Sequence, residues 1–382
     1  MSTEPPIRVL INGIHAKSGG GVTYLRDIIP DLAAIEGFEI HIALHRDQFA
    51  LFGALDERVR IHLFDFPSGL LLSMLWEQAA LPILARLMAA DLVFSPANYG
   101  PILAQRHVIM LRNSLAVIGQ AESLYQRCYW ASLTLMTAVS LLTARRAIAV
   151  SNYAADLLTF HIGWLRRRKV KIAYHGVAER FREAPTNLES QPAPAPFLLA
   201  VSDLYIQKNL HNLVEAMALL APEFPDLTLK IAGRKLDARY ANWVVTLAQK
   251  RGIAHRVELL GGVSPDRLRL LYRQCRVFVF PSTVETFGNP LLEAMASGAA
   301  IASSRTAAMP EVLRDGGSYF SPTDAVEMAQ VIRTLLLDRA LAAQLSERAL
   351  ARSTDFSWKH TAEVTAAILA DAVAPRKRRR PG

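Results

Sequence analysis

At 382 residues, with 51% hydrophobic and 20% charged residues, the chain has a globular composition and the length of two ordinary domains. Its two cysteines, Cys128 and Cys275, lie far apart in the sequence, which argues against a disulfide framework or a zinc site and fits a reducing cytosol. The formal net charge is +9, of which the basic run at residues 376–380 supplies five units. No aromatic residues accompany that run, so nucleic acid is not expected as a partner. The N-terminus shows no secretory signal pattern, so a cytoplasmic location is expected.

Short apolar runs alternate with helical patterns in the first half of the chain. Strands are expected at residues 7–12, 38–44, 91–95, 107–111 and 146–150. A glycine-bearing loop at residues 16–21 follows the first of them. Strands that alternate with helices in this way are typical of a parallel sheet with helices on both faces.

The same alternation starts again in the second half. Further strands are expected at residues 197–202, 227–233, 256–262, 276–282 and 299–304. Between the halves, residues 182–196 contain four prolines and no apolar period, which predicts a linker. The sequence therefore predicts an α/β protein with two doubly wound, Rossmann-like domains, at residues 1–181 and 197–356, and a basic tail at 375–382. Ligands of such sheets bind beyond the carboxyl ends of the strands.

Two apolar stretches, at residues 70–90 and 128–144, are too interrupted or too short for clean membrane-spanning helices. They are expected to be buried helices, or helices with one face at a membrane interface. The basic tail has a similar pair of interpretations, as a solvated segment or as a contact with an anionic membrane surface. A peripheral position on the inner face of the membrane therefore stays open.

The strongest local pattern is FVFPSTVETFGNPLLEAMASG at residues 278–298. A strand and a loop precede a short helix with Asn289 as the expected N-cap, Pro290 in its first turn and Gly298 at its end. The N-terminus of such a helix attracts anions, and Gly288 would let a phosphate approach the backbone. The pattern predicts a phosphate-binding site without a P-loop lysine.

Two glutamates flank this predicted site. Glu293, in the first turns of the helix, could accept hydrogen bonds from the hydroxyls of a ribose. Glu285, in the loop, could face a sugar and stabilise positive charge at its anomeric carbon. The alternative is that both are solvated charges near a helix N-terminus.

The segment at residues 285–298 resembles the E-x7-E motif of the retaining glycosyltransferases of family 4, which adopt the two-domain GT-B fold. Other segments resemble the family in the expected order. They are GGGV (19–22), VSNYAADLL (150–158), YHGV (174–177), QKNL (207–210), MPEV (309–312) and SW (357–358). The resemblance covers nearly the whole chain, and the E-x7-E segment is its specific part.

The resemblance implies two Rossmann-like domains that face each other across a cleft, with the helix at residues 357–374 packed back on the N-terminal domain. It also implies a role for each matching residue. Lys208 would neutralise the donor diphosphate, and Gly20 and Gly21 would admit the donor phosphates from the other domain. Glu285 would contact the transferred sugar and Glu293 the ribose. Backbone groups near Phe287, Gly288 and Asn289 would hold the phosphates and the sugar.

The chain departs from the family pattern at two places. Many members carry an arginine four to six residues before the lysine, where this chain has Asp203, which is expected to turn away or to bind another group. Many members also place a histidine after the strand at 107–111, where this chain has Arg112 and Asn113 as candidates for contact with the sugar. His107, inside that strand, is expected to be a core histidine.

The predicted function is retaining transfer of a hexose-like unit from a nucleoside diphosphate sugar to a saccharide or lipid-linked acceptor, as in the synthesis of cell-surface polysaccharide or lipopolysaccharide. No metal and no cofactor are expected, because Lys208 and the helix at 289–297 would neutralise the leaving group. The alternatives are a nucleotide-sugar 2-epimerase of the same fold and a non-catalytic nucleotide-binding homologue. A nicotinamide oxidoreductase is disfavoured, since NGIHAKSGGGV lacks the GxGxxG spacing.

Overall fold

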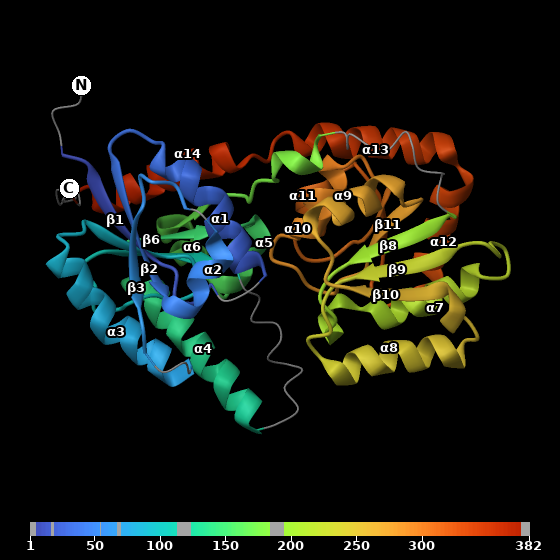
Figure 1. The fold of residues 1–382 in the computed structure, drawn as a ribbon, viewed down its shortest axis with the longest axis horizontal. Coiled ribbons are helices and arrows are strands. Elements are labelled where there is room, and N and C mark those ends of the chain that lie inside the picture. Colours follow the sequence, from blue (N-terminus) through green and yellow to red (C-terminus); the bar gives the residue numbers. More distant parts are fainter. Residues whose placement is uncertain are drawn as a thin grey trace. The chain divides into compact units, whose positions relative to one another are not determined.

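A computed structural model describes residues 5–16, 19–53, 55–66, 70–112, 124–183 and 195–375. The chain divides into two compact units (Figure 1), one formed by residues 1–176 and 357–382 and the other by residues 177–356. Three sequence-based expectations fall outside the described residues: Asn113, most of the linker (184–194) and the basic tail beyond residue 375.

The first unit contains a seven-stranded sheet in which all paired strands are parallel. Its order is β3-β2-β1-β4-β5-β6-β7, so the direction of winding reverses between β1 and β4. The strands are β1 (Ile7–Asn12), β2 (Phe38–His45), β3 (Arg60–Phe64), β4 (Leu92–Ser95), β5 (His107–Leu111), β6 (Arg146–Ala149) and β7 (Val170–Ile172).

Helices cover both faces of this first sheet, as Figure 1 shows. The helices are α1 (Gly20–Ala33), α2 (Phe49–Phe52), α3 (Leu70–Leu87), α4 (Leu124–Thr143), α5 (Asn152–Leu158), α6 (Gly163–Lys169) and α14 (Trp358–Val373). The C-terminal helix α14 packs against α1 and against strands β4 to β6. Gly176 permits this return, because a Cβ atom there would lie 2.2 Å from the backbone nitrogen of Trp358.

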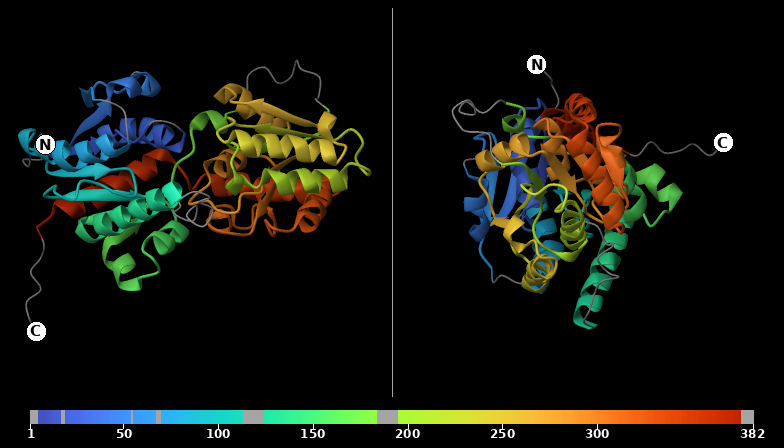
Figure 2. Two further views of the ribbon diagram at one scale, coloured as in Figure 1. Left: turned by 90° about the horizontal axis from the view of Figure 1, so that it is seen from below. Right: turned by 90° about the vertical axis from the view of Figure 1, so that its right-hand side faces the viewer.

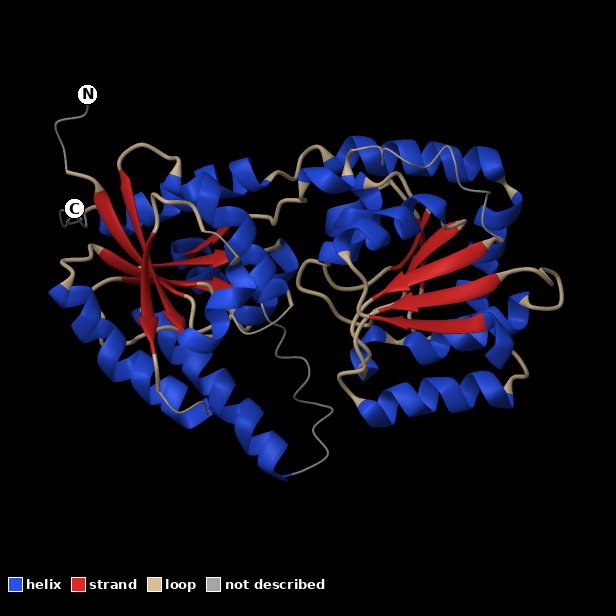
Figure 3. Ribbon diagram, viewed as in Figure 1, coloured by secondary structure: helices blue, strands red, loops and turns tan. Residues whose placement is uncertain are grey.

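The second unit repeats the design with six parallel strands in the order β10-β9-β8-β11-β12-β13. The strands are β8 (Phe197–Val201), β9 (Thr228–Ala232), β10 (Val257–Gly261), β11 (Val277–Phe280), β12 (Ile301–Ser304) and β13 (Ser318–Phe320). Figure 3 shows the strands of this sheet running side by side in one direction. Here the winding reverses between β8 and β11.

The helices of the second unit also lie in two layers, which the views in Figure 2 show from two further sides. They are α7 (Leu210–Leu220), α8 (Ala238–Lys250), α9 (Pro265–Gln274), α10 (Asn289–Ala296), α11 (Met309–Leu313), α12 (Ala325–Leu337) and α13 (Arg339–Ser353). Helices α7, α8 and α12 enclose the main apolar core with one face of the sheet. Helices α9, α10 and α13 pack together in the other layer.

The ten strands expected from the sequence are confirmed, with ends that differ by one or two residues. Three short strands were not anticipated, namely β3, β7 and β13. β7 and β13 are three residues long and β3 alternates polar and apolar residues at a sheet edge, so none forms the apolar run that marks a buried strand. Within the described residues, no helix is both long enough and apolar enough to cross a membrane.

His107 is a core histidine, as expected. Its side chain is buried in β5, and its Nε2 lies 3.3 Å from the carbonyl oxygen of Ser140. Burial lowers the pKa of His107 to about 4. Since the unfolded chain holds this proton more tightly than the folded chain, His107 stabilises the first unit above its unfolded pKa of about 6.5, and that stability is lost as the pH falls toward 4.

We therefore expect the free energy of unfolding of the first unit to depend on pH through His107. The contribution should fall by about 2 kcal/mol between pH 7 and pH 5. Four of the five tryptophans lie in this unit, so fluorescence-monitored guanidinium unfolding reports mainly on it. The variant His107→Gln should lose most of this pH dependence, and an unchanged dependence would contradict the role of His107.

Candidate functional site

The reversal of winding in the second sheet brings the carboxyl ends of β8 and β11 together. Counted along the chain within this unit, the strands lie in the order 3-2-1-4-5-6, which is a doubly wound order. Ligands of such sheets bind in the crevice at the reversal. Lys208 lies in the loop after β8, and Glu285 lies in the loop after β11. The two residues selected from the sequence for the diphosphate and the sugar therefore meet at the position where the fold places a ligand.

Lys208 and Glu285 form an ion pair across this reversal. The distance from Lys208 Nζ to Glu285 Oε1 is 2.5 Å, and the side chains are only 11% and 16% exposed. Burial would lower the pKa of Lys208, but the facing Glu285 carboxylate and Tyr205 outweigh it and raise the pKa above its ordinary value. The ammonium is therefore protonated at neutral pH and is already desolvated, which strengthens its attraction for an anion.

The loop that carries Lys208 is fixed to the rest of the sheet edge by Asn209. This residue adopts a left-handed backbone conformation with φ of 57°, which asparagine tolerates better than most residues. Its side-chain amide donates to the carbonyl oxygens of Pro281, at 2.9 Å, and Pro322, at 2.6 Å. The loops after β8, β11 and β13 are thus held together, and Lys208 is oriented by tertiary contacts.

Helix α10 begins at Asn289, and its N-cap is Gly288 and not Asn289 as the sequence suggested. Gly288 takes the cap position because it adopts φ of 96°, a left-handed conformation that favours glycine. A Cβ atom there would also lie 3.2 Å from the ring of Phe280. Pro290 lies in the first turn, and Gly298, with φ of 71°, follows the last turn as expected. The positive end of the α10 dipole therefore lies at Gly288 and Asn289, next to the loop that carries Glu285.

The remaining residues of the E-x7-E segment are arranged by buried aromatic rings. Tyr272, a fully buried residue of α9, donates from its hydroxyl to Glu293 Oε2 at 3.0 Å. Phe287 is buried against Phe356, with ring centroids 5.9 Å apart, so only its backbone can face a ligand. Tyr272 could not be predicted from the sequence, because nothing in the RLRLLYRQ segment marks it as a partner of a distant glutamate.

Asp203 binds another residue, as expected for an acid at this position. Arg234, in the loop after β9, donates to both carboxylate oxygens of Asp203, at 3.2 Å from Nε and 2.6 Å from its terminal nitrogen. Partial burial alone would raise the pKa of Asp203, but the bonds from Arg234 outweigh it and lower the pKa. The neighbouring Gly233 allows this approach, since a Cβ there would lie 1.8 Å from the Ser202 carbonyl oxygen.

In the first unit, the structure brings together three of the four residues assigned to that domain. A Cβ atom at Gly21 would lie 2.5 Å from the guanidinium of Arg112, so the arginine lies directly against this glycine. The same guanidinium lies 3.5 Å from the carbonyl oxygen of Gly20. Burial lowers the pKa of Arg112, although an arginine stays protonated in proteins. The positively charged Arg112 side chain thus lies against Gly20 and Gly21 at the start of α1.

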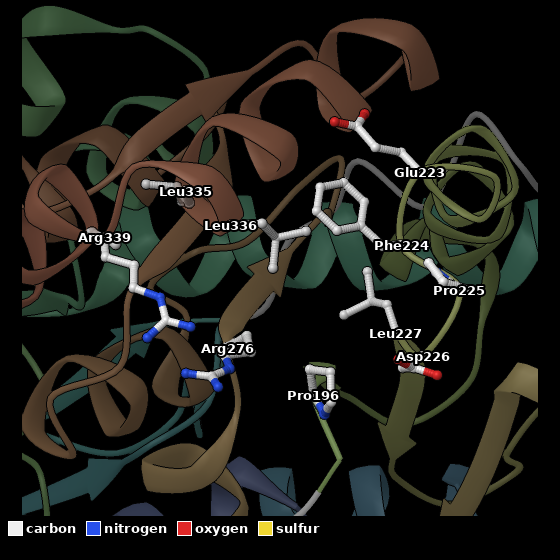
Figure 4. Close-up of a pocket in the computed structure, with 11 residues that line it drawn as sticks. Pro196, Glu223, Phe224, Pro225, Asp226, Leu227, Arg276, Leu335, Leu336 and Arg339 are labelled. Carbon is white, nitrogen blue, oxygen red and sulfur yellow. The ribbon is translucent and has the colours of Figure 1, made fainter.

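Two further features of the described residues bear on the site. No group of three or more histidine, cysteine, aspartate or glutamate side chains comes together in a way that could hold a metal ion in the ranges that the structure covers. A pocket of about 500 Å³ in the second unit, drawn in Figure 4, has Phe224, Leu227 and Leu336 among its apolar lining residues. It lies beside Pro196 and Arg276, which precede β8 and β11. The pocket is therefore at the amino ends of these strands, whereas Lys208 is at their carboxyl ends.

Two doubly wound units, with a lysine–glutamate pair and a helix N-terminus at the second reversal, define the class of GT-B glycosyltransferases. Solved structures of that fold resemble the chain. Sucrose-phosphate synthase from Thermosynechococcus elongatus has a TM-score of 0.78 and 18% identity, with 95% of this chain and 98% of that chain covered. Anabaena HepE, solved in complex with UDP and glucose, has a TM-score of 0.75 and 20% identity, with 95% and 99% covered.

Sequence comparisons identify the family. The model of "Glycosyltransferase Family 4" matches residues 18–180, and that of "Glycosyl transferases group 1" matches residues 186–352. The chain belongs to this family of glycosyltransferases. One similar relative, the serotype-specific mannosyltransferase WbdA of Escherichia coli, is 34% identical over 173 residues, which are 45% of this chain and 21% of the relative. The chain thus spans about a fifth of that relative's length.

Proposed function

We propose that this protein transfers a hexose from a nucleoside diphosphate sugar to a saccharide or lipid-linked acceptor, with retention of the anomeric configuration. The observation that carries the proposal is the pairing of Lys208 with Glu285 beside the N-terminus of α10, at the point where β8 and β11 diverge. That point can hold a diphosphate on one side and a sugar on the other. The family membership supports the reaction class, and WbdA and HepE support a mannosyl or glucosyl unit.

In this proposal the ion pair exchanges partners when the donor binds. The diphosphate takes Lys208 as its counter-ion, and Glu285 is released to face the sugar ring, where positive charge develops as the leaving group departs. The N–H groups of α10 share the negative charge of the leaving diphosphate, so no metal ion is needed. Glu293, oriented by Tyr272, accepts hydrogen bonds from the ribose.

Arg234 takes the place of the missing arginine before Lys208. The family resemblance implies a second cation beside the donor diphosphate, and the loop after β8 offers Asp203 instead. Asp203 holds the Arg234 guanidinium from the neighbouring strand at the same sheet edge, and its carboxylate is close enough to Lys208 for the two charges to interact. The acidic residue therefore positions the cation that the donor requires.

Nucleotide binding is the first test of the proposal. A thermal-shift panel of UDP, GDP and ADP with their glucose and mannose sugars, in EDTA, should find one nucleotide that raises the melting temperature of the second unit by about 5–10 °C at 100 times its Kd. Lys208→Ala should abolish this shift and Arg234→Ala should reduce it. Lys250→Ala, an exposed lysine at the end of α8, is the matched control and should change nothing. No shift with any nucleotide would contradict the proposal.

The exchange of partners predicts opposite effects of Glu285→Gln on binding and on turnover. Removal of the carboxylate frees Lys208, so the nucleoside diphosphate should bind as tightly as before or more tightly. Turnover of the nucleotide sugar should fall about a hundredfold or more, because charge at the anomeric carbon is no longer stabilised. Proton NMR of the product reports the anomeric configuration, and an inverted product would contradict retention.

The control for this experiment is Glu223→Gln. Glu223 pairs with Arg333 in the same unit, but the two side chains are 43% and 51% exposed. An exposed pair of this kind contributes little to stability, so both affinity and turnover should stay at the wild-type level. Near-normal turnover of Glu285→Gln would remove Glu285 from the chemistry.

We further propose that the acceptor is reached at an anionic membrane surface. The support is a set of exposed leucines on two helices of the first unit: Leu75 (66% exposed) and Leu87 (80%) on α3, and Leu135 (65%) and Leu142 (57%) on α4. Apolar side chains on a helix surface add binding energy when they enter the interfacial layer, and basic residues of the chain add attraction to anionic lipids.

Vesicle co-sedimentation tests the membrane proposal. Leu75→Glu combined with Leu87→Glu, and separately deletion of residues 375–382, should each weaken binding to phosphatidylglycerol vesicles severalfold while nucleotide binding is unchanged. Leu219→Glu, an exposed leucine of α7 in the second unit, is the matched control. Equal vesicle binding by all of these proteins would dismiss the membrane contact.

A further inference from the structure

The pocket drawn in Figure 4 is formed by residues of the second unit alone. The turn at residues 223–227 forms one wall, and the end of α12 together with the start of α13 forms another. The residues that precede β8 and β11 complete the lining. Its volume of about 500 Å³ is within the range of sites that bind small molecules.

Hydrogen bonds hold the walls of this pocket in place. The Arg256 side chain donates from Nη1 to the carbonyl oxygens of Ala221 and Phe224, both at 3.1 Å. The backbone nitrogen of Arg276 donates to the carbonyl oxygen of Phe197 at 2.9 Å. The pocket is therefore formed before any ligand arrives, and a ligand would not have to order its walls.

One part of the lining is apolar and continuous with the main core of the unit. Leu227 and Leu335 are each 2% exposed and belong to that core, and Phe224 and Leu336 pack against it. Figure 4 shows Phe224, Leu227 and Leu336 across the middle of the pocket. Apolar surface of a ligand that covers these side chains is removed from water, which favours binding.

The other part of the lining carries two positive charges. Arg276 and Arg339 are both exposed, and among the residues that the structure describes no side chain pairs with either guanidinium. Figure 4 shows both guanidiniums on one side of the pocket and the two carboxylates of the lining on the other. Of these carboxylates, Glu223 is paired with Arg333 at 2.7 Å, and Asp226 is exposed to solvent.

The two arginines indicate the kind of anion that the pocket can hold. A phosphate monoester carries between one and two negative charges at neutral pH, and a guanidinium can pair with two of its oxygen atoms. Two guanidiniums therefore match one phosphate monoester in charge and in hydrogen-bond donors. A carboxylate has a single charge and would leave one arginine without a counter-ion.

We propose that this pocket binds a soluble phosphate monoester with an apolar body, such as an alkyl phosphate. The phosphate lies between Arg276 and Arg339, and the apolar body covers Phe224 and Leu336. This site is separate from the one that contains Lys208, since the two are at opposite ends of β8. That strand has five residues, and at about 3.3 Å per residue its ends are roughly 15 Å apart. The inference does not depend on the proposed function.

Calorimetric titration of the full-length protein with octyl phosphate tests the proposal. Octyl phosphate should bind at least tenfold more tightly than ethyl phosphate, because its longer chain is buried in the pocket. It should also bind severalfold more tightly than octanoate, which has one negative charge. The combined variant Arg276→Gln and Arg339→Gln should weaken binding of octyl phosphate about tenfold or more. Arg267→Gln, an exposed arginine of α9 outside the pocket, is the matched control and should bind as the wild type does.

Two further measurements separate this pocket from the other proposed sites. Lys208→Ala should bind octyl phosphate as tightly as the wild type, and the double arginine variant should keep its nucleotide-induced thermal shift and its binding to phosphatidylglycerol vesicles. Loss of vesicle binding would assign the arginines to a membrane surface, and loss of octyl phosphate binding in Lys208→Ala would assign the phosphate to the donor site. Either result overturns the proposal.

The proposal is also overturned if octyl phosphate does not bind, if the double variant binds it as tightly as the wild type, or if octanoate binds equally well. Both arginines are exposed, so the double variant should keep the melting temperature of the wild type. A wild-type protein that binds octyl phosphate but no nucleotide would contradict the proposed function and support the pocket.

Discussion

The proposed donor site depends on one buried ion pair, Lys208 with Glu285, which joins the loops after the two central strands of the second unit. A buried pair of this kind adds little net stability, because the desolvation of both charges offsets most of their attraction. The pair instead holds the Lys208 ammonium in place, with little exposure to water, before any ligand binds. The Lys208 ammonium is already desolvated and oriented by tertiary contacts. Under the proposed function, Lys208 exchanges one anionic partner for another when a diphosphate binds. In the proposed reaction, the displaced Glu285 carboxylate then stabilises charge at the anomeric carbon.

The two sheets share the same topology but carry different polar side chains. Both wind outward from a central pair of strands, β1 and β4 in one and β8 and β11 in the other, and both place polar side chains where that pair diverges. In the second unit these side chains are a cation and a carboxylate suited to a diphosphate sugar. In the first they are the imidazole of His15 and the phenol of Tyr99. Both sheets therefore carry polar side chains at the reversal, and the loops determine which residues these are.

Sequence patterns predicted most of the features that are local in the chain. The apolar strands, the glycine and proline at the start of α10 and Gly298 at its end are all determined by neighbours within a few residues. The N-cap was misplaced by one residue because asparagine and glycine both suit that position, and only the φ of 96° at Gly288 decides between them. The short edge strands were missed because they bury too little to leave an apolar run.

The contacts that orient the sites join residues distant in sequence, and no local pattern reveals them. Glu77 pairs with His15 across 62 positions, and Lys208 pairs with Glu285 across 77. Tyr272 contacts Glu293 because α9 and α10 pack together. Arg234 contacts Asp203 because they follow the neighbouring strands β9 and β8. Asp203 departs from the family pattern, and its contact with Arg234 explains how an acidic residue is accommodated there. Lys208, Glu285 and Glu293 could be selected from the sequence, but the roles of Tyr272 and Arg234 required the fold.

The central claim is that the Lys208–Glu285 pair opens to receive a diphosphate. A crystal structure of the full chain with the nucleoside diphosphate that stabilises it most tests this directly. The account predicts that the β-phosphate lies against the N-terminus of α10 with Lys208 Nζ within hydrogen-bond distance, and that Glu285 has moved away from the lysine. A diphosphate bound elsewhere, with the 2.5 Å contact between Lys208 and Glu285 intact, would contradict it.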